Sequence, residues 1–291
     1  MNEKRLRQAS KIRYITAVFL YGTIGLMVHY INLPSEVIVL CRGVIGTFFI
    51  LCYTGLTGRR LDRKAVRSNL PWLILSGICL GLNWVFLFAA YRYTTVAVAS
   101  LCNYMAPIIV IFLSPFLFHE KLGGKKLLCV FSAFAGIVLV SGVGAGGGAD
   151  IRRGGVALGL AAAACFVGLV LCNRKMRNLS AYDKALVQLG VSAATVLPYV
   201  IFNNYGTGLH PDHRSALLVL ILGVVHTGMA YCLYFGSLGE LPVQTISILG
   251  YIEPVVSVLS SALILREPLS AGSMVGAVLI IGAAVASEMI S

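Results

Sequence analysis

Two ionisable residues in otherwise apolar surroundings are the strongest candidates for chemistry. Arg42 lies in the segment Val39-Leu40-Cys41-Arg42-Gly43, and Glu253 directly precedes a proline. A charge at the centre of a bilayer costs on the order of 3 kcal/mol or more, so it is retained where it is paired, hydrated or needed. We expect Arg42 to face a carboxylate or phosphate, and Glu253 to face a cation or carry a proton, a combination that suits a zwitterion. The alternative is a structural Arg42, paired with Glu36 or Glu253 or bound to backbone carbonyls.

Further polar and aromatic side chains in the apolar segments could complete a binding site. Polar groups in lipid need partners, so we expect them to face the protein interior. Aromatic rings there could stack on a flat substrate or hold a cation, although packing between helices is the alternative. The predicted substrate-binding residues are Arg42, Asn83, Trp84, Asn103, Tyr104, Gln188, Tyr231, Tyr251 and Glu253.

Two prolines and two histidines extend this set. Pro107 and Pro254 each remove a backbone donor near mid-span. Freed carbonyls at membrane depth are tolerated where they line a hydrated cavity, so we predict hinges there, with ordinary kinks as the alternative. His29 and His226 join Glu253 as proton-coupling candidates, because the ordinary pKa of histidine lies near 6.5. The alternative for each is a hydrogen-bonded core histidine.

Other motifs predict no chemistry. We expect Glu120 and Glu267, at the ends of apolar segments, to cap helices or form interfacial salt bridges. His210-Pro211-Asp212-His213 reads as a polar turn, and the eight cysteines, which include no CxxC pair, read as small buried apolar residues. We therefore predict no metal site and no cofactor. The chain also contains no Walker A and no GxSxG sequence, so neither ATP-driven pumping nor this hydrolase chemistry is supported.

The composition places these residues in a membrane protein. Of 291 residues, 58% are hydrophobic and 12% are charged, and the mean hydropathy is +0.87. A soluble domain carries roughly 25% charged residues and could not cover so apolar a chain with polar surface. This excludes a disordered chain, a secreted disulfide scaffold and a free cytosolic enzyme. The net charge of +12 would suggest nucleic acid in a soluble protein, but basic membrane loops are the better explanation.

Ten apolar segments are long enough to cross the hydrocarbon core as helices. The first follows a basic stretch but has no small-residue cleavage site after it, so we predict a retained helix rather than a signal peptide. The fold class is therefore all-α and integral to the membrane. The segments are 14–31, 35–57, 71–91, 94–118, 126–143, 154–173, 182–203, 215–236, 243–265 and 271–290.

The basic residues predict the orientation. With the N-terminus in the cytoplasm, the inner segments hold seventeen of the 23 Lys and Arg residues and the outer loops hold five, with Arg42 left within a span. This imbalance fits the positive-inside rule with both termini cytoplasmic. It also accounts for the basic charge without nucleic acid, and it predicts a multi-pass protein of the inner cell membrane.

The two halves of the chain are related by an internal repeat. At an offset of 147 residues, Tyr104 matches Tyr251, Pro107 matches Pro254 and Glu120 matches Glu267. A glycine-rich linker separates the halves, giving the units 1–143, 144–153 and 154–291. Because each half holds five spans, an odd number, the second half enters the membrane from the opposite side. The sequence therefore predicts two inverted repeats, a pattern typical of secondary transporters.

These features resemble the EamA-type members of the drug/metabolite transporter superfamily. The resemblance rests on the arginine of the second segment, on Pro107 through His119-Glu120-Lys121-Leu122, and on the repeat of that stretch from Pro254 to Arg266-Glu267-Pro268-Leu269. It spans nearly the whole chain and implies a ten-helix carrier that moves a small metabolite by alternating access. The halves differ where the charges lie, since Arg42 aligns with Leu189 and Glu253 with Ala106. We therefore expect an asymmetric site.

The predicted function is secondary export of small amphipathic or zwitterionic metabolites such as amino acids, with proton coupling left open. The alternative within transport is efflux of cationic lipophilic drugs or quaternary amines through an aromatic box. A membrane enzyme would need paired acid–base groups or metal ligands, and a sensor would need a soluble output domain. We expect neither, and we expect the partners to be a small-molecule substrate and the lipid bilayer, in a monomer or a homodimer.

Overall fold

The computed structural model describes residues 3–118, 123–141, 149–203, 212–238, 240–241 and 243–289. Within these ranges the protein is helical and contains no strand. The helices are α1 (Glu3–Gly22), α2 (Ile24–His29), α3 (Ser35–Leu56), α4 (Arg63–Ser68), α5 (Leu70–Tyr93), α6 (Val96–Asn103), α7 (Ala106–Phe118), α8 (Gly124–Ser141), α9 (Ala149–Lys175), α10 (Ala181–Phe202), α12 (His213–Gly223), the π-helix η1 (Val224–Met229), α13 (Ala230–Leu238), α14 (Val243–Gly250), α15 (Ile252–Leu263) and α16 (Ala271–Met289).

Seven segments of the described chain are long and apolar enough to cross a membrane, and three shorter apolar helices accompany them. A helix satisfies its own backbone hydrogen bonds, which is why such segments are helical in lipid. The shorter helices are Leu127–Leu139, Ile252–Leu263 and Ala271–Ala286. The described parts of the chain are all-helical, as predicted, and their apolar helices are those of a multi-pass membrane protein, whereas the count of ten spans and their inverted orientation remain predictions.

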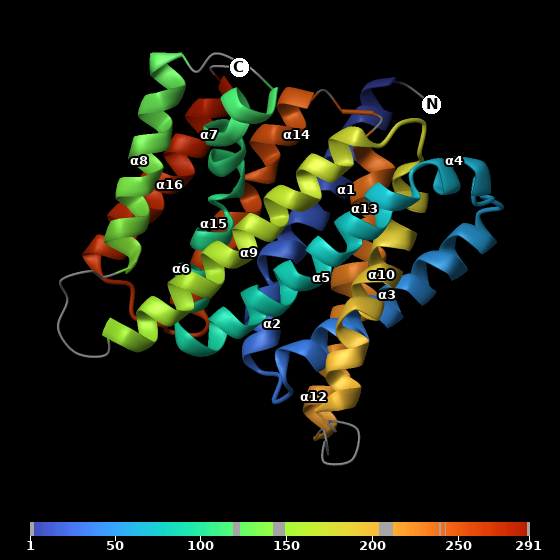
Figure 1. Cartoon of the computed structure of the whole chain (residues 1–291), viewed down its shortest axis with the longest axis horizontal. Helices are drawn as coiled ribbons and strands as arrows, with labels where there is room; N and C mark the ends of the chain where they lie inside the picture. The colour runs from blue at the N-terminus through green and yellow to red at the C-terminus, as the bar shows by residue number, and fades with distance from the viewer. Residues whose placement is uncertain are drawn as a thin grey trace.

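The helices pack against one another mainly as long neighbouring pairs. In Figure 1, α8 and α16 lie side by side at one flank of the molecule, and α3 and α10 lie at the other. Between them α5 packs along α9 and α10, and α1 packs along α13 and α15. The start of α1 and the end of α16 lie at the same edge of the molecule (Figure 1).

Glycines allow the closest of these approaches. A Cβ added at Gly77 would lie 2.5 Å from Cβ of Val191 on α10, and one at Gly159 would lie 2.7 Å from Cβ of Cys102 on α6. The GxxxG pairs of the sequence that begin at Gly77 and Gly155 are therefore helix contacts, where the missing side chain lets two backbones meet.

We expect Gly77→Ala to destabilise the protein, because the new methyl group overlaps Val191 and also comes within 3.1 Å of the Gln188 carbonyl. Overpacking of this kind costs about 1–3 kcal/mol. Thermal unfolding in detergent measures the effect. Gly282→Ala on α16 is the matched control, since a Cβ there meets nothing within 4 Å. Equal melting temperatures for the two variants would contradict the close contact.

The structure corrects several expectations. Residues 94–118 and 243–265, each predicted as one span, are each divided into two helices. Helix α9 begins at Ala149, so residues 149–153 of the predicted linker are helical, and the basic loop after α3 contains the unpredicted helix α4, which the Asp62 side chain caps. All eight cysteines are free, but only four of them are buried as predicted; three are half-buried and Cys52 is exposed. The expectations for Glu120, for the linker at 144–148 and for His210 lie outside the described residues.

Candidate functional site

Arg42 is buried in α3, where aromatic rings and a hydroxyl group hold its side chain. Its guanidinium carbon lies 3.8 Å from the centre of the Trp84 ring on α5, a cation–π arrangement. Its Nε donates a 2.8 Å hydrogen bond to the Thr227 hydroxyl. Arg42 forms no ion pair with Glu36 or Glu253, although all three side chains are described. The predicted pairing of Arg42 with a glutamate is therefore absent, and within the described residues Nε is the guanidinium nitrogen that forms a hydrogen bond to the protein.

The acceptor Thr227 lies in the π-helix η1, between α12 and α13. Its hydroxyl accepts from Arg42 and donates to the Leu222 carbonyl, five residues earlier. A π-turn inserts one extra residue into a helix and is frequent at functional sites. Here it brings a buried hydroxyl to the guanidinium, and no pattern in the sequence predicted this role for Thr227.

Glu253 lies in the first turn of α15, half-buried and surrounded by phenol groups. The Tyr104 phenol and Arg42 both lie close enough to Glu253 to interact with its charge. Further tyrosines are close enough to interact with its charge, and of these only Tyr231 was predicted as a substrate-binding residue. The additional ones are Tyr14, Tyr21, Tyr91 and Tyr234. Arg42 is coupled to Tyr21, Tyr91 and Tyr231, so the cation and the acid share one aromatic environment.

Matching helix breaks place Tyr104 and Tyr251 beside this environment. Helix α6 ends at Asn103, and α7 resumes before Pro107; α14 ends at Gly250, and α15 resumes before Pro254. Each proline lacks the N–H that would bond to the carbonyl four residues earlier, so the helix opens just ahead of it. Broken helices at the same position of both halves are typical of transporter binding sites. The function of the prolines as hinges remains a proposal.

The predicted amides lie in networks between helices. Asn83 donates to the Asn103 side chain at 2.9 Å and to the Ala162 carbonyl at 2.8 Å, which joins α5, α6 and α9. Gln188 donates to Ser76 and Asn173, at 2.7 and 2.8 Å. Asn83 and Asn103 thus come together close to Tyr104, whereas the Gln188 amide binds other protein groups rather than Arg42.

The two predicted histidines lie in different environments. His226 is buried in η1, shares a 3.1 Å hydrogen bond with Thr23, and is close enough to Arg42 to interact with its charge. His29 is partly exposed at the end of α2, with Nδ1 4.0 Å from a Glu267 oxygen. The structure therefore places His226, and not His29, beside the site.

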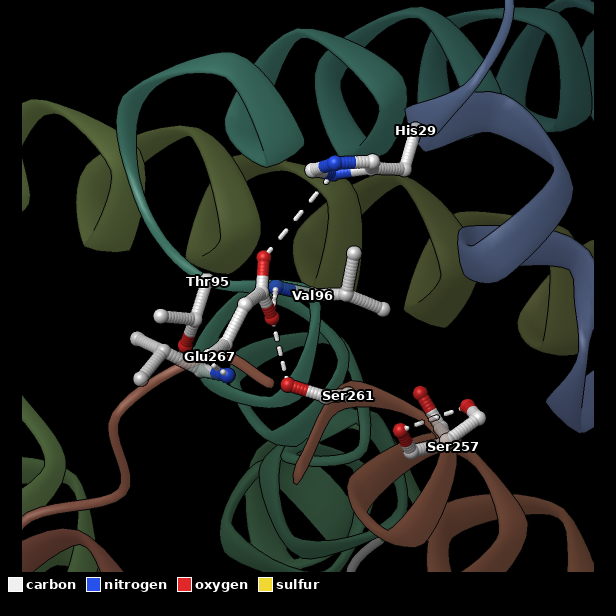
Figure 2. A network of polar contacts seen from close by, with 8 residues as sticks. His29, Thr95, Val96, Ser257, Ser261 and Glu267 are labelled. Atoms are coloured by element: carbon white, nitrogen blue, oxygen red, sulfur yellow. Dashed lines mark hydrogen bonds and ion pairs between the residues drawn. The ribbon is translucent and has the colours of Figure 1, made fainter. Parts of the chain in front are cut away.

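Glu267 joins three helices near the end of the molecule where α2 ends. Figure 2 shows the backbone N–H of Val96, the Ser261 hydroxyl and the His29 ring converging on its carboxylate. The Val96 N–H donates at 2.9 Å to this carboxylate from the first turn of α6. The prediction of Glu267 as a helix cap is confirmed, with the detail that the capped helix belongs to the other half of the chain.

We expect Thr227→Val to weaken ligand binding at Arg42, because valine keeps the shape but removes the acceptor for Nε and frees the guanidinium to turn. A hydrogen bond to a charged group contributes about 1.5–3 kcal/mol, so affinity should fall by at least about 10-fold. Ligand-induced thermal shifts measure this. Thr195→Val is the control, since its hydroxyl bonds only to the Val191 carbonyl of its own helix. Unchanged affinity in Thr227→Val would contradict the positioning role.

Comparison with known proteins agrees with the transporter class that the sequence predicts. The profile of the EamA-like transporter family matches residues 12–142 and 153–287, which is nearly the whole chain in two stretches. A solved crystal structure shares the fold with a TM-score of 0.66 at 20% identity, covering 97% of this chain and 98% of the other.

Two relatives have informative names. An uncharacterized transporter of Bacillus subtilis is 27% identical over 254 residues, which cover 87% of this chain and 80% of the relative. A protein named a probable amino-acid metabolite efflux pump, from Escherichia coli, is 29% identical over 228 residues, which cover 74% of this chain and 76% of the relative.

Proposed function

The chain belongs to the EamA-like transporter family, and from this premise we propose that it exports small zwitterionic metabolites such as amino acids by alternating access. Membership makes the protein a transporter and not an enzyme, as the sequence predicted. The name of the Escherichia coli relative, which refers to amino-acid metabolite efflux, favours this substrate class and the export direction.

The relation between Arg42 and Glu253 carries the proposal. The two groups interact electrostatically and come from different halves of the chain, yet they form no ion pair. Opposite charges at membrane depth are expensive unless they are paired or hydrated. A zwitterion satisfies both, with its carboxylate on the Nη groups of Arg42 and its ammonium group on Glu253 and Tyr104. The surrounding tyrosines then contact the substrate side chain.

The pattern of helix contacts supports two inverted five-span repeats, 1–143 and 154–291, with the linker between them. Exchanging the halves converts the α5–α9 contact into α13–α1, α6–α9 into α14–α1, and α7–α9 into α15–α1. It also converts α5–α10 into the contacts of α3 with α12 and η1. The α3–α10 and α8–α16 contacts convert into themselves. This exchange is what a pseudo-twofold axis requires, and such repeats around a central site provide alternating access.

Flux in proteoliposomes tests the function. Purified protein should catalyse saturable counterflow of a radiolabelled amino acid, found by screening a panel of metabolites. A complete panel of neutral, basic and aromatic amino acids without specific flux would reject the substrate class.

A reporter fused after Met289 should respond as cytoplasmic, and a periplasmic response would reject the ten-span orientation.

A second candidate function, efflux of cationic lipophilic drugs or quaternary amines, is favoured by the tyrosines around Glu253. Aromatic rings and an acid together bind such cations. The two candidates differ in their need for Arg42, which a zwitterion requires and a lipophilic cation does not. Transport of a quaternary amine that survives in Arg42→Ala would favour this second function.

A further inference from the structure

A pocket of about 280 Å³ lies between α1, α3 and the segment formed by η1 and α13, and neither Arg42 nor Glu253 lines it. Its walls are mostly apolar, and one arginine borders it. Met229, on its wall, is 38% exposed, so the pocket opens at the surface that the hydropathy of these helices assigns to lipid. The lining residues are Arg13, Phe49, Tyr53, Met229, Cys232, Leu233 and Gly236.

The pocket runs from the level of the membrane surface into the hydrocarbon. Arg13 directly precedes the predicted first span and Gly236 ends the predicted eighth, so the predicted spans would place both at the interface. The apolar stretch Leu6–His29 of the structure includes Arg13, whose long side chain can extend to that level. Met229 lies seven residues from Gly236 along the helix, which is roughly 10 Å deeper at 1.5 Å per residue. A ligand that fills the pocket must therefore be polar at one end and apolar at the other.

The polar end of the pocket is cationic. Arg13 is exposed and forms no ion pair within the described parts of the chain. A second guanidinium, that of Arg59, lies 4.5 Å from the centre of the Tyr182 ring, which stacks on the wall residue Tyr53 at 5.7 Å. Arg59 also acts electrostatically on Cys232 of the wall. Two arginines beside an apolar slot complement a ligand with an anionic head and an alkyl chain.

We propose that this pocket binds one anionic phospholipid, with its phosphate near Arg13 and Arg59 and an acyl chain along Phe49, Met229 and Leu233. Basic pockets between membrane helices on the cytoplasmic side bind anionic headgroups in this way. The lipid would join α1, α3 and α13, and α3 carries Arg42 while η1, adjoining α13, carries Thr227. Occupancy should therefore stabilise the arrangement that holds the site.

The test uses the full chain, delipidated in detergent and titrated with phosphatidylglycerol or phosphatidylcholine of the same acyl composition. Native mass spectrometry measures bound lipid, and thermal unfolding measures stabilisation. We expect a preference for phosphatidylglycerol and a melting temperature raised by a few degrees. Arg13→Gln should weaken phosphatidylglycerol binding about 5-fold, since one basic residue near an anionic surface contributes about 1 kcal/mol. Arg67→Gln, an exposed residue of α4 outside the pocket, should leave it unchanged.

Met229→Trp provides an independent variant, because an indole ring in the slot should exclude the acyl chain while both arginines remain. Equal binding of the two lipids would overturn the proposal, as would an Arg13→Gln variant that binds phosphatidylglycerol like the wild type. Stabilisation by inorganic phosphate or glycerol phosphate equal to that by phosphatidylglycerol would also overturn it, since the site would then bind a soluble anion. These readouts do not use transport, so their failure leaves the proposed function untouched.

Discussion

Arg42→Gln is expected to reduce amino-acid counterflow in proteoliposomes strongly while the protein still folds. The variant removes the cation that would bind the substrate carboxylate and leaves that carboxylate without a partner in a buried site. Removing one member of a buried charged contact costs about 2–5 kcal/mol, so kcat/KM should fall by about 30-fold or more. Retention of the folded state should be checked by thermal unfolding, because glutamine also loses the cation–π contact with Trp84.

Two further variants separate charge from geometry. Arg42→Lys keeps the positive charge but loses the planar guanidinium. The lysine ammonium group therefore cannot stack on Trp84 and bond to Thr227 at the same time. We expect reduced but measurable flux, between that of the wild type and that of Arg42→Gln. Arg214→Gln is the matched control, since its guanidinium also lies over a tyrosine, 4.7 Å from the ring centre of Tyr30, but outside the site. Wild-type flux in Arg42→Gln would show that Arg42 is structural.

The sequence predicts the charged residues of this site and the helix breaks beside it. Arg42 and Glu253 stand out because a charge in an apolar segment requires a reason. Pro107 and Pro254 mark helix breaks because a missing N–H acts locally, and the breaks appear within three residues of each proline. Such features depend on the identity of one residue and its neighbours, so they can be read without knowledge of the packing.

The positioning residues were harder to predict, because their roles arise from packing. Thr227 is one of several hydroxyl residues in apolar segments, and it reaches Arg42 only because η1 has a π-turn. Tyr21 joins the aromatic environment through the packing of α1 on α13, which no sequence spacing reveals. Gln188 shows the opposite difficulty. It was predicted to bind substrate because it is polar in an apolar segment, but its amide bonds to Ser76 and Asn173 of neighbouring helices.

Glu253→Gln is expected to remove the dependence of export on a proton gradient while leaving exchange between equal pools of substrate at a reduced rate. The carboxyl group lies beside the helix break at Tyr251, where alternating access would expose it to each side in turn. A carboxyl group so placed can carry one proton per cycle, and glutamine cannot. Gradient-driven and exchange flux should be measured in the same proteoliposomes, with Glu36→Gln, from the first turn of α3, as the control.

A substrate analogue without its amino group distinguishes proton carriage from ammonium binding at Glu253. If Glu253 only binds the ammonium group, the analogue should bind equally well to the wild type and to Glu253→Gln, and the variant should keep its response to the gradient. If Glu253 carries the proton, the variant should lose that response for the amino acid and for the analogue alike. Flux that stays normal and pH-sensitive in Glu253→Gln would place coupling elsewhere, and His226 beside Arg42 is then the next group to replace.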